Sequence, residues 1–300
     1  MAAPADVQVG HVNNPPTSNA TRNAPSGNVL FSGAAWLLVI ALFAPVISWL
    51  VRIWTMSIYD AHGALVPLLV VGMIFAQRSV LAVTPRAPDI AGFALTGAGL
   101  LLLLQALLMN CNLLGGVALV AVVAGMVWTL WGRAVLRLLA FPLVFLLLML
   151  PLNYPLEILL GFRLRLLATK LSAMFLTLLG LKINVHGTII ATSQFAVAIE
   201  SPCSGLKTLS ALLLAGIVLA YFQHKSWWQR GLIVLLVPPV ALLANALRNT
   251  AIILIGHNYG QPAAMGWLHA FSGLMTFLLA VALLILISET LLWRRKPAST

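Results

Sequence analysis

Charged residues are scarce in this 300-residue chain, and acidic ones are the scarcest. There are 17 lysines and arginines but only 6 aspartates and glutamates, so 8% of positions carry a charge, against about 25% in soluble domains. Hydrophobic residues make up 61% of the chain, and its mean hydropathy is +1.03. A water-soluble protein of this composition would expose more apolar surface than water tolerates. The composition therefore excludes soluble enzyme folds and predicts a polytopic membrane protein.

Cysteine is also rare, because only Cys111 and Cys203 are present, too few for a disulfide scaffold. No cluster of His, Cys and Asp has the spacing of metal ligands, so we expect no metal or other cofactor. The formal net charge of +11 would suggest nucleic acid in a soluble chain. Here the basic residues lie mostly between apolar stretches, where membrane topology and lipid headgroups account for them. We expect membrane lipids as partners, and no nucleic acid.

Eight apolar stretches are long enough, or nearly so, to cross a bilayer, which takes about 20 residues. None alternates like a barrel strand, and helices satisfy their own backbone groups in lipid, so we predict an all-α bundle of about eight transmembrane helices. The predicted spans are 30–51, 63–77, 90–109, 113–131, 134–151, 204–222, 229–247 and 267–290.

The two ends of the chain differ from this apolar domain. Residues 1–28 are rich in Pro, Asn, Ala and Ser and are expected to be a disordered tail. Residues 29–292 form the predicted transmembrane domain, and residues 293–300 a basic tail.

Basic residues in short loops predict the orientation, since cytoplasmic loops are enriched in Lys and Arg. The loop 78–86, the turn 224–230 and the end of the chain at 294–296 all carry such residues. Eight spans with both termini in the cytoplasm fit this pattern. They place Cys203, at the start of the sixth span, on the outer face.

Residues 155–180 do not fit a span, because Glu157, Arg163, Arg165 and Lys170 lie among the leucines. Arg163 and Lys170 are seven residues apart and share a helical face, which predicts an amphipathic helix at the outer interface. Residues 182–199 contain β-branched residues and are expected to form a small extended or hairpin-like outer cap.

Cys203, Arg248 and His269 come from three predicted helices that meet the same membrane surface. A thiol, a guanidinium and an imidazole are the groups that covalent acyl transfer requires. Ser201 and Pro202 suit the cap and first residue of a helix. Cys203 is then expected in the first turn, where the helix dipole favours a thiolate. Arg248 would bind a substrate carboxylate or an oxyanion, and His269 would act as general base and acid.

Each of these residues also has an ordinary structural interpretation. Cys203 suits a small apolar residue at the end of a span, and Arg248 suits an arginine that reaches a lipid headgroup. His269 follows Trp267 and would fit an interfacial aromatic belt. His257 and His186 are also predicted on the outer side, so chemistry alone leaves the choice of histidine open.

The first outer loop is a second polar feature. Tyr59, Asp60 and His62 precede the second predicted span, where they could orient a substrate or simply begin a helix at the headgroups. Cys111 lies between two asparagines at another predicted outer turn. A bridge from Cys111 to Cys203 would consume the nucleophile, so we interpret Cys111 as a bystander.

Four motifs, in this order, resemble those of the exosortase/archaeosortase family of membrane cysteine transpeptidase-like enzymes. Tyr59, His62, Gly63 and Pro67 match an early Tyr-x-His-Gly-x-x-x-Pro stretch, and Glu200 to Lys207 match a motif built around Cys-Ser-Gly-Leu. The Asn-x-x-Arg and His-x-x-x-Gly motifs are matched by Asn245 with Arg248 and by His269 with Gly273. The resemblance runs from about residue 34 to 290. Pro202 departs from the pattern.

The resemblance implies that Cys203 is the nucleophile, Arg248 the clamp for oxyanion or substrate, and His269 the proton shuttle. Supporting or substrate-binding residues would then be Glu200, Ser204, Lys207, Asn245, Tyr59 and His62. The implied substrates are exported proteins whose C-terminal sorting signal has a Pro-Glu-Pro-like (PEP-CTERM) motif, one membrane span and a basic tail. The implied setting is the bacterial inner membrane, with a link to exopolysaccharide production.

Two other classes of function stay open from the sequence. A transporter would use intramembrane charges such as Lys207 and Arg248 as its pathway, although no inverted repeat is visible. A non-catalytic scaffold for polysaccharide or lipid export would need no reactive thiol.

Overall fold

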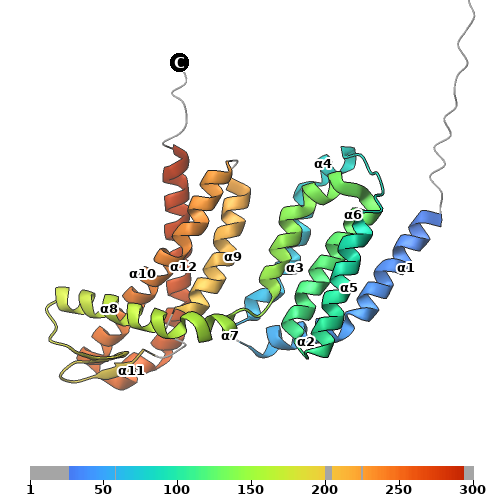
Figure 1. The fold of residues 1–300 in the computed structure, drawn as a ribbon. Helices are drawn as coiled ribbons and strands as arrows, with labels where there is room; N and C mark the ends of the chain where they lie inside the picture. The colour runs from blue at the N-terminus through green and yellow to red at the C-terminus, as the bar shows by residue number, and fades with distance from the viewer. Residues whose placement is uncertain (1–26, 58, 200–204, 224–225, 294–300) are drawn as a thin grey trace, which may run out of the picture. The chain divides into compact units, whose positions relative to one another are not determined.

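The computed structural model describes residues 27–57, 59–199, 205–223 and 226–293, without the side chains of 27–32, 267–270 and 291–293. The predicted tails, 1–28 and 293–300, fall almost wholly outside these residues. The chain divides into two compact units, residues 1–42 and 43–300. Helix α1 (Gly27–Leu42) belongs to the first unit, and all other described elements belong to the second (Figure 1).

Helices make up almost all of the second unit. In chain order its elements are α2 (Ala44–Met56), the 3-10 helix η1 (Ala61–Ala64), α3 (Leu65–Ala76), α4 (Arg78–Val83), α5 (Gly92–Leu108), α6 (Asn112–Phe145), the 3-10 helix η2 (Leu146–Met149), α7 (Asn153–Leu156), the π-helical turn η3 (Glu157–Gly161), α8 (Phe162–Leu178), β1 (Asn184–His186), β2 (Ile189–Ala191), β3 (Ala196–Ala198), α9 (Leu206–Gln223), α10 (Trp227–Tyr259), α11 (Gln261–Met265) and α12 (Trp267–Trp293). The predicted all-α membrane architecture is thereby confirmed in its class.

Small residues let α5 and α6 pack in close contact, as is common between membrane helices. A Cβ added to Gly92 would lie 2.4 Å from the backbone nitrogen of Thr129, and one added to Gly125 would lie 2.5 Å from that of Thr96. The two helices share the most extensive contact between any two elements in the described chain. Their apolar runs therefore pack against each other as well as facing outward.

Helix α6 is interrupted at Gly132, which has a left-handed φ of 87° and ψ of 173°. A Cβ at this position would lie 2.1 Å from the carbonyl oxygen of Ala87, so only glycine fits. The interruption falls between the predicted spans 113–131 and 134–151. Both stretches therefore lie in α6 and the short helix η2 that follows it.

The prediction of eight spans is not confirmed. Among the described residues, four helices have the length and apolarity to cross a membrane, or five if Gly33–Leu42 and Ala44–Met56 count as one span. Helices α3 and α5 have 12 and 17 residues, and the two stretches of α6 count as one. The four helices are Asn112–Met149, Leu206–Gln223, Trp227–Tyr259 and Phe271–Thr290.

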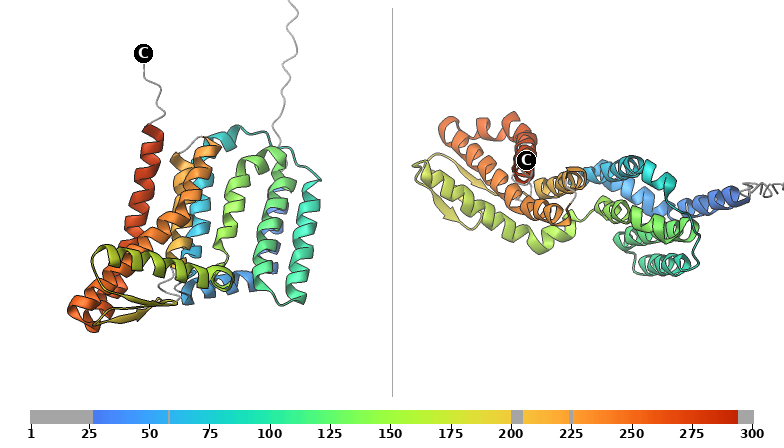
Figure 2. Two further views of the ribbon diagram at one scale, coloured as in Figure 1. Left: turned by 60° about the vertical axis from the view of Figure 1, so that its left-hand side comes forward. Right: turned by 90° about the horizontal axis from the view of Figure 1, so that it is seen from above.

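The charged segment 155–180 contains helix α8, whose buried face packs on α10. Thr169 and Ser172 are fully buried, and Ser172 Oγ donates a 3.2 Å hydrogen bond to the carbonyl oxygen of Ala246. Arg163 and Lys170 are exposed on the other side. Figures 1 and 2 show α8 crossing the direction of α9 and α12. This arrangement suits the predicted interfacial helix.

Residues 184–198 form a three-stranded antiparallel sheet in the order β1-β2-β3. It packs on α8, α10 and α11 through a shared apolar core. That core contains Ala168, Leu176, Ile190, Phe195, Ile199, Ile252, Ile253 and Ala264. A second core, between α9, α10 and α12, contains Leu212, Val237, Val240, Ala241, Ala244, Ala280 and Leu284. Helix α10 therefore contributes to both cores.

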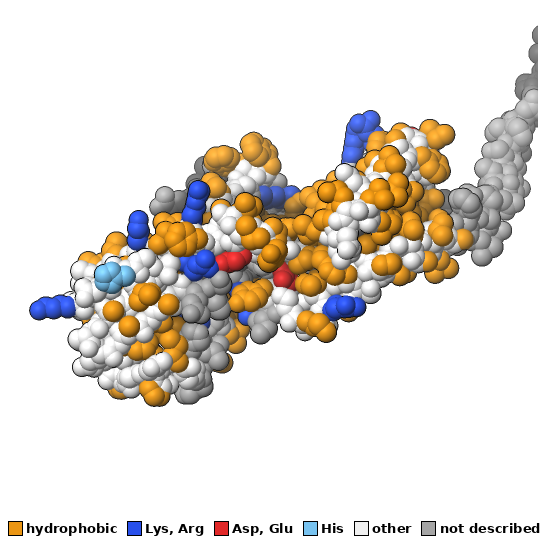
Figure 3. Space-filling model, turned by 60° about the horizontal axis from the view of Figure 1, so that its bottom comes forward, with side chains coloured by type: hydrophobic (Ala, Val, Ile, Leu, Met, Phe, Trp, Pro, Cys, Tyr) orange, Lys and Arg blue, Asp and Glu red, His pale blue; other side chains and the backbone are white. Residues whose placement is uncertain are grey.

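The surface of the second unit remains largely apolar. Figure 3 shows basic side chains scattered singly among apolar ones on one face, with few acidic side chains. In the described chain, the ion pair between Arg165 and Glu157 is the one salt bridge present. Such a surface suits contact with lipid.

Candidate active site

Arg248 lies within α10, not at its end. The predicted span stopped at residue 247, but the helix continues to Tyr259. Neighbouring elements cover this polar turn, because Asn245 and Asn249 are only 1% and 4% exposed. Thr250 Oγ1 also donates to the carbonyl oxygen of Ala246, at 2.8 Å, within the helix. The expected boundary was wrong because burial against other helices sustains the helix through its polar residues.

Arg248 is joined to α12 by a hydrogen bond. Its Nε donates to Ser272 Oγ at 2.8 Å, and the Arg248 side chain is half-buried. Thr276, one turn further along α12, donates from Oγ1 to the carbonyl oxygen of Ser272 at 2.7 Å. His269 precedes Ser272 by one turn of the same helix. The Asn-x-x-Arg and His-x-x-x-Gly segments are therefore adjacent.

The residue two places after Cys203 lies against α10. Gly205 is buried and has a left-handed φ of +87°, and a Cβ there would be 3.1 Å from Asn245 Cγ. Asn245 is one turn before Arg248. The positive φ favours glycine, and a Cβ there would make an unusually tight contact with Asn245, which gives this motif position a structural reason.

Helix α9 begins two residues after the predicted start of the sixth span, residue 204. The sequence predicted Pro202 as the first helical residue and Cys203 in the first turn. The helix begins at Leu206, because the left-handed Gly205 cannot belong to a right-handed helix. Pro202 and Cys203 themselves lie outside the described residues, so the expected help of the helix dipole to a Cys203 thiolate stays a prediction.

Four predicted site residues lie outside what the structure describes. Glu200, Cys203 and Ser204 fall in the segment 200–204, and the side chain of His269 is also outside. The described neighbours of these residues meet at a single helix, since Gly205 lies against Asn245 and Ser272 binds Arg248.

The other two candidate histidines lie elsewhere. His257 Nδ1 is 3.2 Å from Thr192 Oγ1 beside the sheet. It is nine residues beyond Arg248 on α10, or about 13 Å along the helix axis. His186 is exposed on strand β1. His257 therefore lies apart from the contact between Arg248 and Ser272.

A polar network that sequence reasoning missed joins the loop after α2, which was predicted to be outer, to α9. Asn153 is 5% exposed, and its Nδ2 donates to the Tyr59 carbonyl oxygen at 2.8 Å and to Asp60 Oδ1 at 2.9 Å. Its Oδ1 accepts a hydrogen bond from Ser210 Oγ, in the second turn of α9. Ser57 Oγ donates to the other carboxylate oxygen of Asp60 at 2.8 Å. The only sequence signal was the polar Asn153 between apolar runs.

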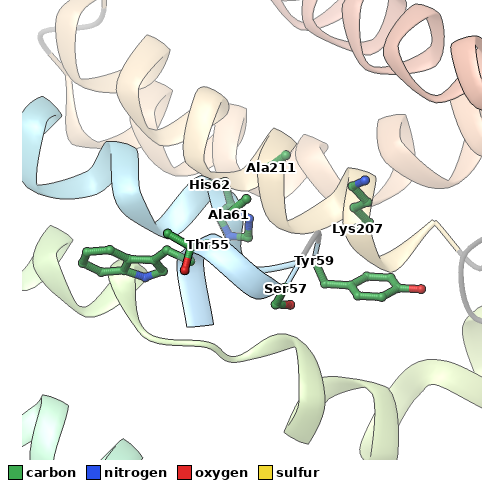
Figure 4. A pocket seen from close by; sticks show the side chains of 8 residues that line it. Thr55, Ser57, Tyr59, Ala61, His62, Lys207 and Ala211 are labelled. Atoms are coloured by element: carbon green, nitrogen blue, oxygen red, sulfur yellow. The ribbon is translucent and has the colours of Figure 1, made fainter. Parts of the chain in front are cut away.

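Tyr59, His62 and Lys207, all predicted site residues, line one cavity of about 440 Å³ (Figure 4). Its walls come from α2, the following loop and η1 on one side and the first turns of α9 on the other. The lining residues are Trp54, Thr55, Ser57, Tyr59, Ala61, His62, Lys207 and Ala211. The cavity thus adjoins the segment that follows Cys203.

His62 also lines a second, smaller cavity, of about 40 Å³, together with Asn153 and Ser210. Burial lowers the pKa of His62, which precedes the apolar helix α3, and this effect outweighs the Asp60 carboxylate and the Tyr59 backbone, which raise the pKa. Burial therefore disfavours the charged form of this imidazole, and Lys207 is the one lysine or arginine among the described residues that line the larger cavity.

Gly63 has a packing role in this region. Trp54 Nε1 donates to the carbonyl oxygen of Met149 at 2.9 Å. A Cβ on Gly63 would lie 2.5 Å from that indole nitrogen and 2.8 Å from the Met149 oxygen. The glycine therefore lets η1 approach the end of η2.

Neither a metal site nor a disulfide emerges from the part of the chain described. No group of three or more His, Cys, Asp or Glu side chains within it is placed to hold a metal ion. Cys111 is a free thiol, half-buried, at the N-terminus of α6.

Comparison with known proteins identifies the class. The family model of the transmembrane exosortases matches residues 54–286, which include all the motifs described above. The chain belongs to the transmembrane exosortase family, and the resemblance seen in the sequence is confirmed. This membership makes it a membrane protein of a family of sorting transpeptidases. No curated protein and no solved structure matches the chain.

Proposed function

We propose that this protein is a cysteine peptidase or transpeptidase that cleaves the C-terminal sorting signal of exported proteins. Cys203 is the nucleophile, Arg248 stabilises the developing oxyanion and His269 moves the proton. The observation that carries this assignment is the pair of contacts made by one turn of α10. Asn245 contacts Gly205, which belongs to the motif from Glu200 to Lys207. Arg248 binds Ser272 of α12, the helix that contains His269.

The chemistry follows from these three groups. His269 accepts the proton of the Cys203 thiol, and the thiolate attacks the scissile carbonyl carbon. The negative charge that develops on the carbonyl oxygen is stabilised by the Arg248 guanidinium, which the bond to Ser272 orients. When the C–N bond breaks, His269 returns the proton to the departing amine. Water, an amine or a hydroxyl then attacks the resulting thioester and regenerates the thiol.

The position of basic residues supports a site on the outer side of the membrane. The C-terminal end of α9 is bound by Gln77, through the hydroxyl of Tyr221, and by Arg230, whose guanidinium lies 5.4 Å from the Tyr221 ring centroid. Arg78 follows Gln77. The Gly205 end of α9 is 18 residues away, about 27 Å, close to the thickness of a bilayer core. Because basic ends face the cytoplasm, the site faces outward in our proposal.

The proposed substrates are exported proteins with a PEP-CTERM-like tail, in the inner membrane of a bacterium that makes exopolysaccharide. A substrate span would dock among helices that already face lipid and bring its scissile bond to the outer rim. Both termini of the enzyme are cytoplasmic in this arrangement.

The experiment is to co-express the protein with an exported reporter that ends in a Pro-Glu-Pro motif, one span and a basic tail. We expect Cys203→Ala to abolish trimming of the reporter while the protein level stays unchanged. Cys111→Ala, which removes the other cysteine, is the matched control and should trim at the rate of the unmodified protein. Intact-mass analysis of the product identifies the cut and any acceptor.

The outcomes separate the three classes of function. Trimming that persists in Cys203→Ala contradicts the nucleophile. Solute flux that survives the same substitution, without trimming, favours a transporter. Polysaccharide export that continues while Cys203 stays inert to thiol reagents favours a scaffold.

A further inference from the structure

We propose that the cavity between the loop after α2 and the first turns of α9 is a subsite for a carboxylate of the substrate tail, selected by Lys207. This inference rests on the proposed function, because it takes a peptide tail as the occupant. It goes further by naming the residue that sets the preference for an acidic substrate and the surface that holds it.

Charge is the first observation. Lys207 is exposed at the cavity and makes no ion pair with any carboxylate that the structure describes. Asp60, next to two lining residues in the sequence, does not itself line the cavity, and both of its oxygens accept hydrogen bonds, from Ser57 and from Asn153. Among the described residues, the lining therefore presents a cation without a neutralising acid, which complements an anionic group.

The rest of the lining suits a short peptide. Trp54 and Tyr59 offer ring surfaces for the apolar atoms on either side of a carboxylate. The hydroxyls of Ser57 and Thr55 already donate within the fold, to Asp60 and to backbone carbonyl oxygens of α2, which leaves Lys207 as the charged donor of the described lining. The volume, about 440 Å³, lies within the range of ligand sites. In Figure 4 the Tyr59 ring and the Lys207 side chain lie on the same side of the set of lining residues.

Position is the third observation. Lys207 lies two residues after Gly205, which contacts Asn245 one turn before Arg248. The cavity is therefore close, along the chain, to the residue proposed as the nucleophile. The Asn153 bonds to the loop and to Ser210 hold the two walls of the cavity together.

The first experiment measures binding without turnover. The full-length Cys203→Ala protein, in phosphatidylcholine nanodiscs, is treated with an amine-acetylating reagent, and modification of Lys207 is followed by mass spectrometry. A peptide containing Pro-Glu-Pro, at about ten times its dissociation constant, should slow labelling of Lys207 about tenfold. Lys182, an exposed lysine outside the cavity, is the internal control and should keep its rate. The Pro-Gln-Pro peptide should protect Lys207 much less.

The second experiment measures selection during processing. We expect reporters with Pro-Glu-Pro to be trimmed about tenfold more efficiently than those with Pro-Gln-Pro, the usual effect of a charge-assisted hydrogen bond. Lys207→Gln should abolish this ratio and Lys182→Gln should preserve it. Lys207→Glu should invert the preference towards a Pro-Lys-Pro reporter, which loss of folding could not do.

Results that contradict the subsite differ from results that contradict the proposed function. Equal protection by the Glu and Gln peptides, or protection by neither, overturns the subsite. Protection of Lys207 by phosphatidylglycerol nanodiscs without peptide assigns the cavity to a lipid headgroup and also overturns it. Protection by the Glu peptide with no trimming of any reporter overturns the proposed function but not the subsite.

Discussion

Gly205 lies so close to the side chain of Asn245 that a Cβ on the glycine would be 3.1 Å from Asn245 Cγ. This contact packs the residue two places after Cys203 against α10, the helix that contains Arg248. We expect Gly205→Ala to lower thermal stability in detergent and to reduce processing. A left-handed conformation costs an L-residue about 1–2 kcal/mol, and the tight contact adds to that cost. Unfolding temperature and the rate of reporter trimming are the measurements.

Gly231→Ala is the matched control, because Gly231 lies in α10 and nothing is within 4 Å of its Cβ position. Alanine at such a helical site is expected to stabilise by up to about 1 kcal/mol. If the two variants had the same unfolding temperature and trimming rate, the close approach of Gly205 to Asn245 would contribute neither to stability nor to activity.

A second prediction concerns the guanidinium. Arg248→Lys keeps the charge but loses the planar set of donors. We expect kcat for reporter trimming to fall by about 10²–10³, as for loss of one oxyanion donor, with little change in KM. Ser272→Ala removes the partner of Nε and should cost less, about tenfold. A rise in KM at constant kcat would instead make Arg248 a ground-state binding residue.

Much of the fold follows from the sequence, because apolar runs in lipid admit only helices. The runs that became α3, α5, α9 and α12 were predicted to within a few residues. Counting spans and basic loops predicted that Cys203, Arg248 and His269 meet at one membrane surface. The structure shows contacts of their described neighbours, Gly205 with Asn245 and Ser272 with Arg248. Tyr59, His62 and Lys207 were named in advance and line one cavity.

Hydropathy could not locate the boundaries that tertiary packing decides. Helix α10 runs past Arg248 because neighbouring elements bury Asn245 and Asn249. Helix α9 begins late because Gly205 adopts a left-handed conformation, which a sequence shows only as a glycine. The sequence did not predict a role for Asn153, because its hydrogen-bond partners Ser210 and Asp60 are 57 and 93 positions away.

A third prediction concerns acid stability. Asp89 lies in the loop before α5 and accepts hydrogen bonds from the Ala91 backbone and from Trp128 Nε1, at 2.9 and 2.8 Å. These bonds lower the pKa of Asp89, the backbone bond having the larger effect. A lowered folded-state pKa gives stability that is complete above the unfolded pKa, about 3.9, and is lost as the pH falls through the folded value.

Trp128→Phe should therefore lower the unfolding temperature at pH 6 to 7, and the deficit should shrink below about pH 4. Asp89→Asn should show the same pH trend, because it removes the titrating group. A deficit in Trp128→Phe that stays constant from pH 7 to pH 3 would show that packing of the indole, not its bond to the carboxylate, stabilises the loop.

Asn153 gives the sharpest test of the network behind the site. Asn153→Asp keeps the acceptor for Ser210 but loses both donors and sets a second carboxylate against Asp60. We expect a loss of about 2–3 kcal/mol in the free energy of unfolding, with a matching loss of reporter trimming. Adding Asp60→Asn restores a donor and removes the repulsion, so the double variant should recover at least about half of that loss, as in a double-mutant cycle between coupled residues. Additive effects in the cycle, measured by denaturation in detergent, would mean that Asn153 and Asp60 do not interact as the structure places them.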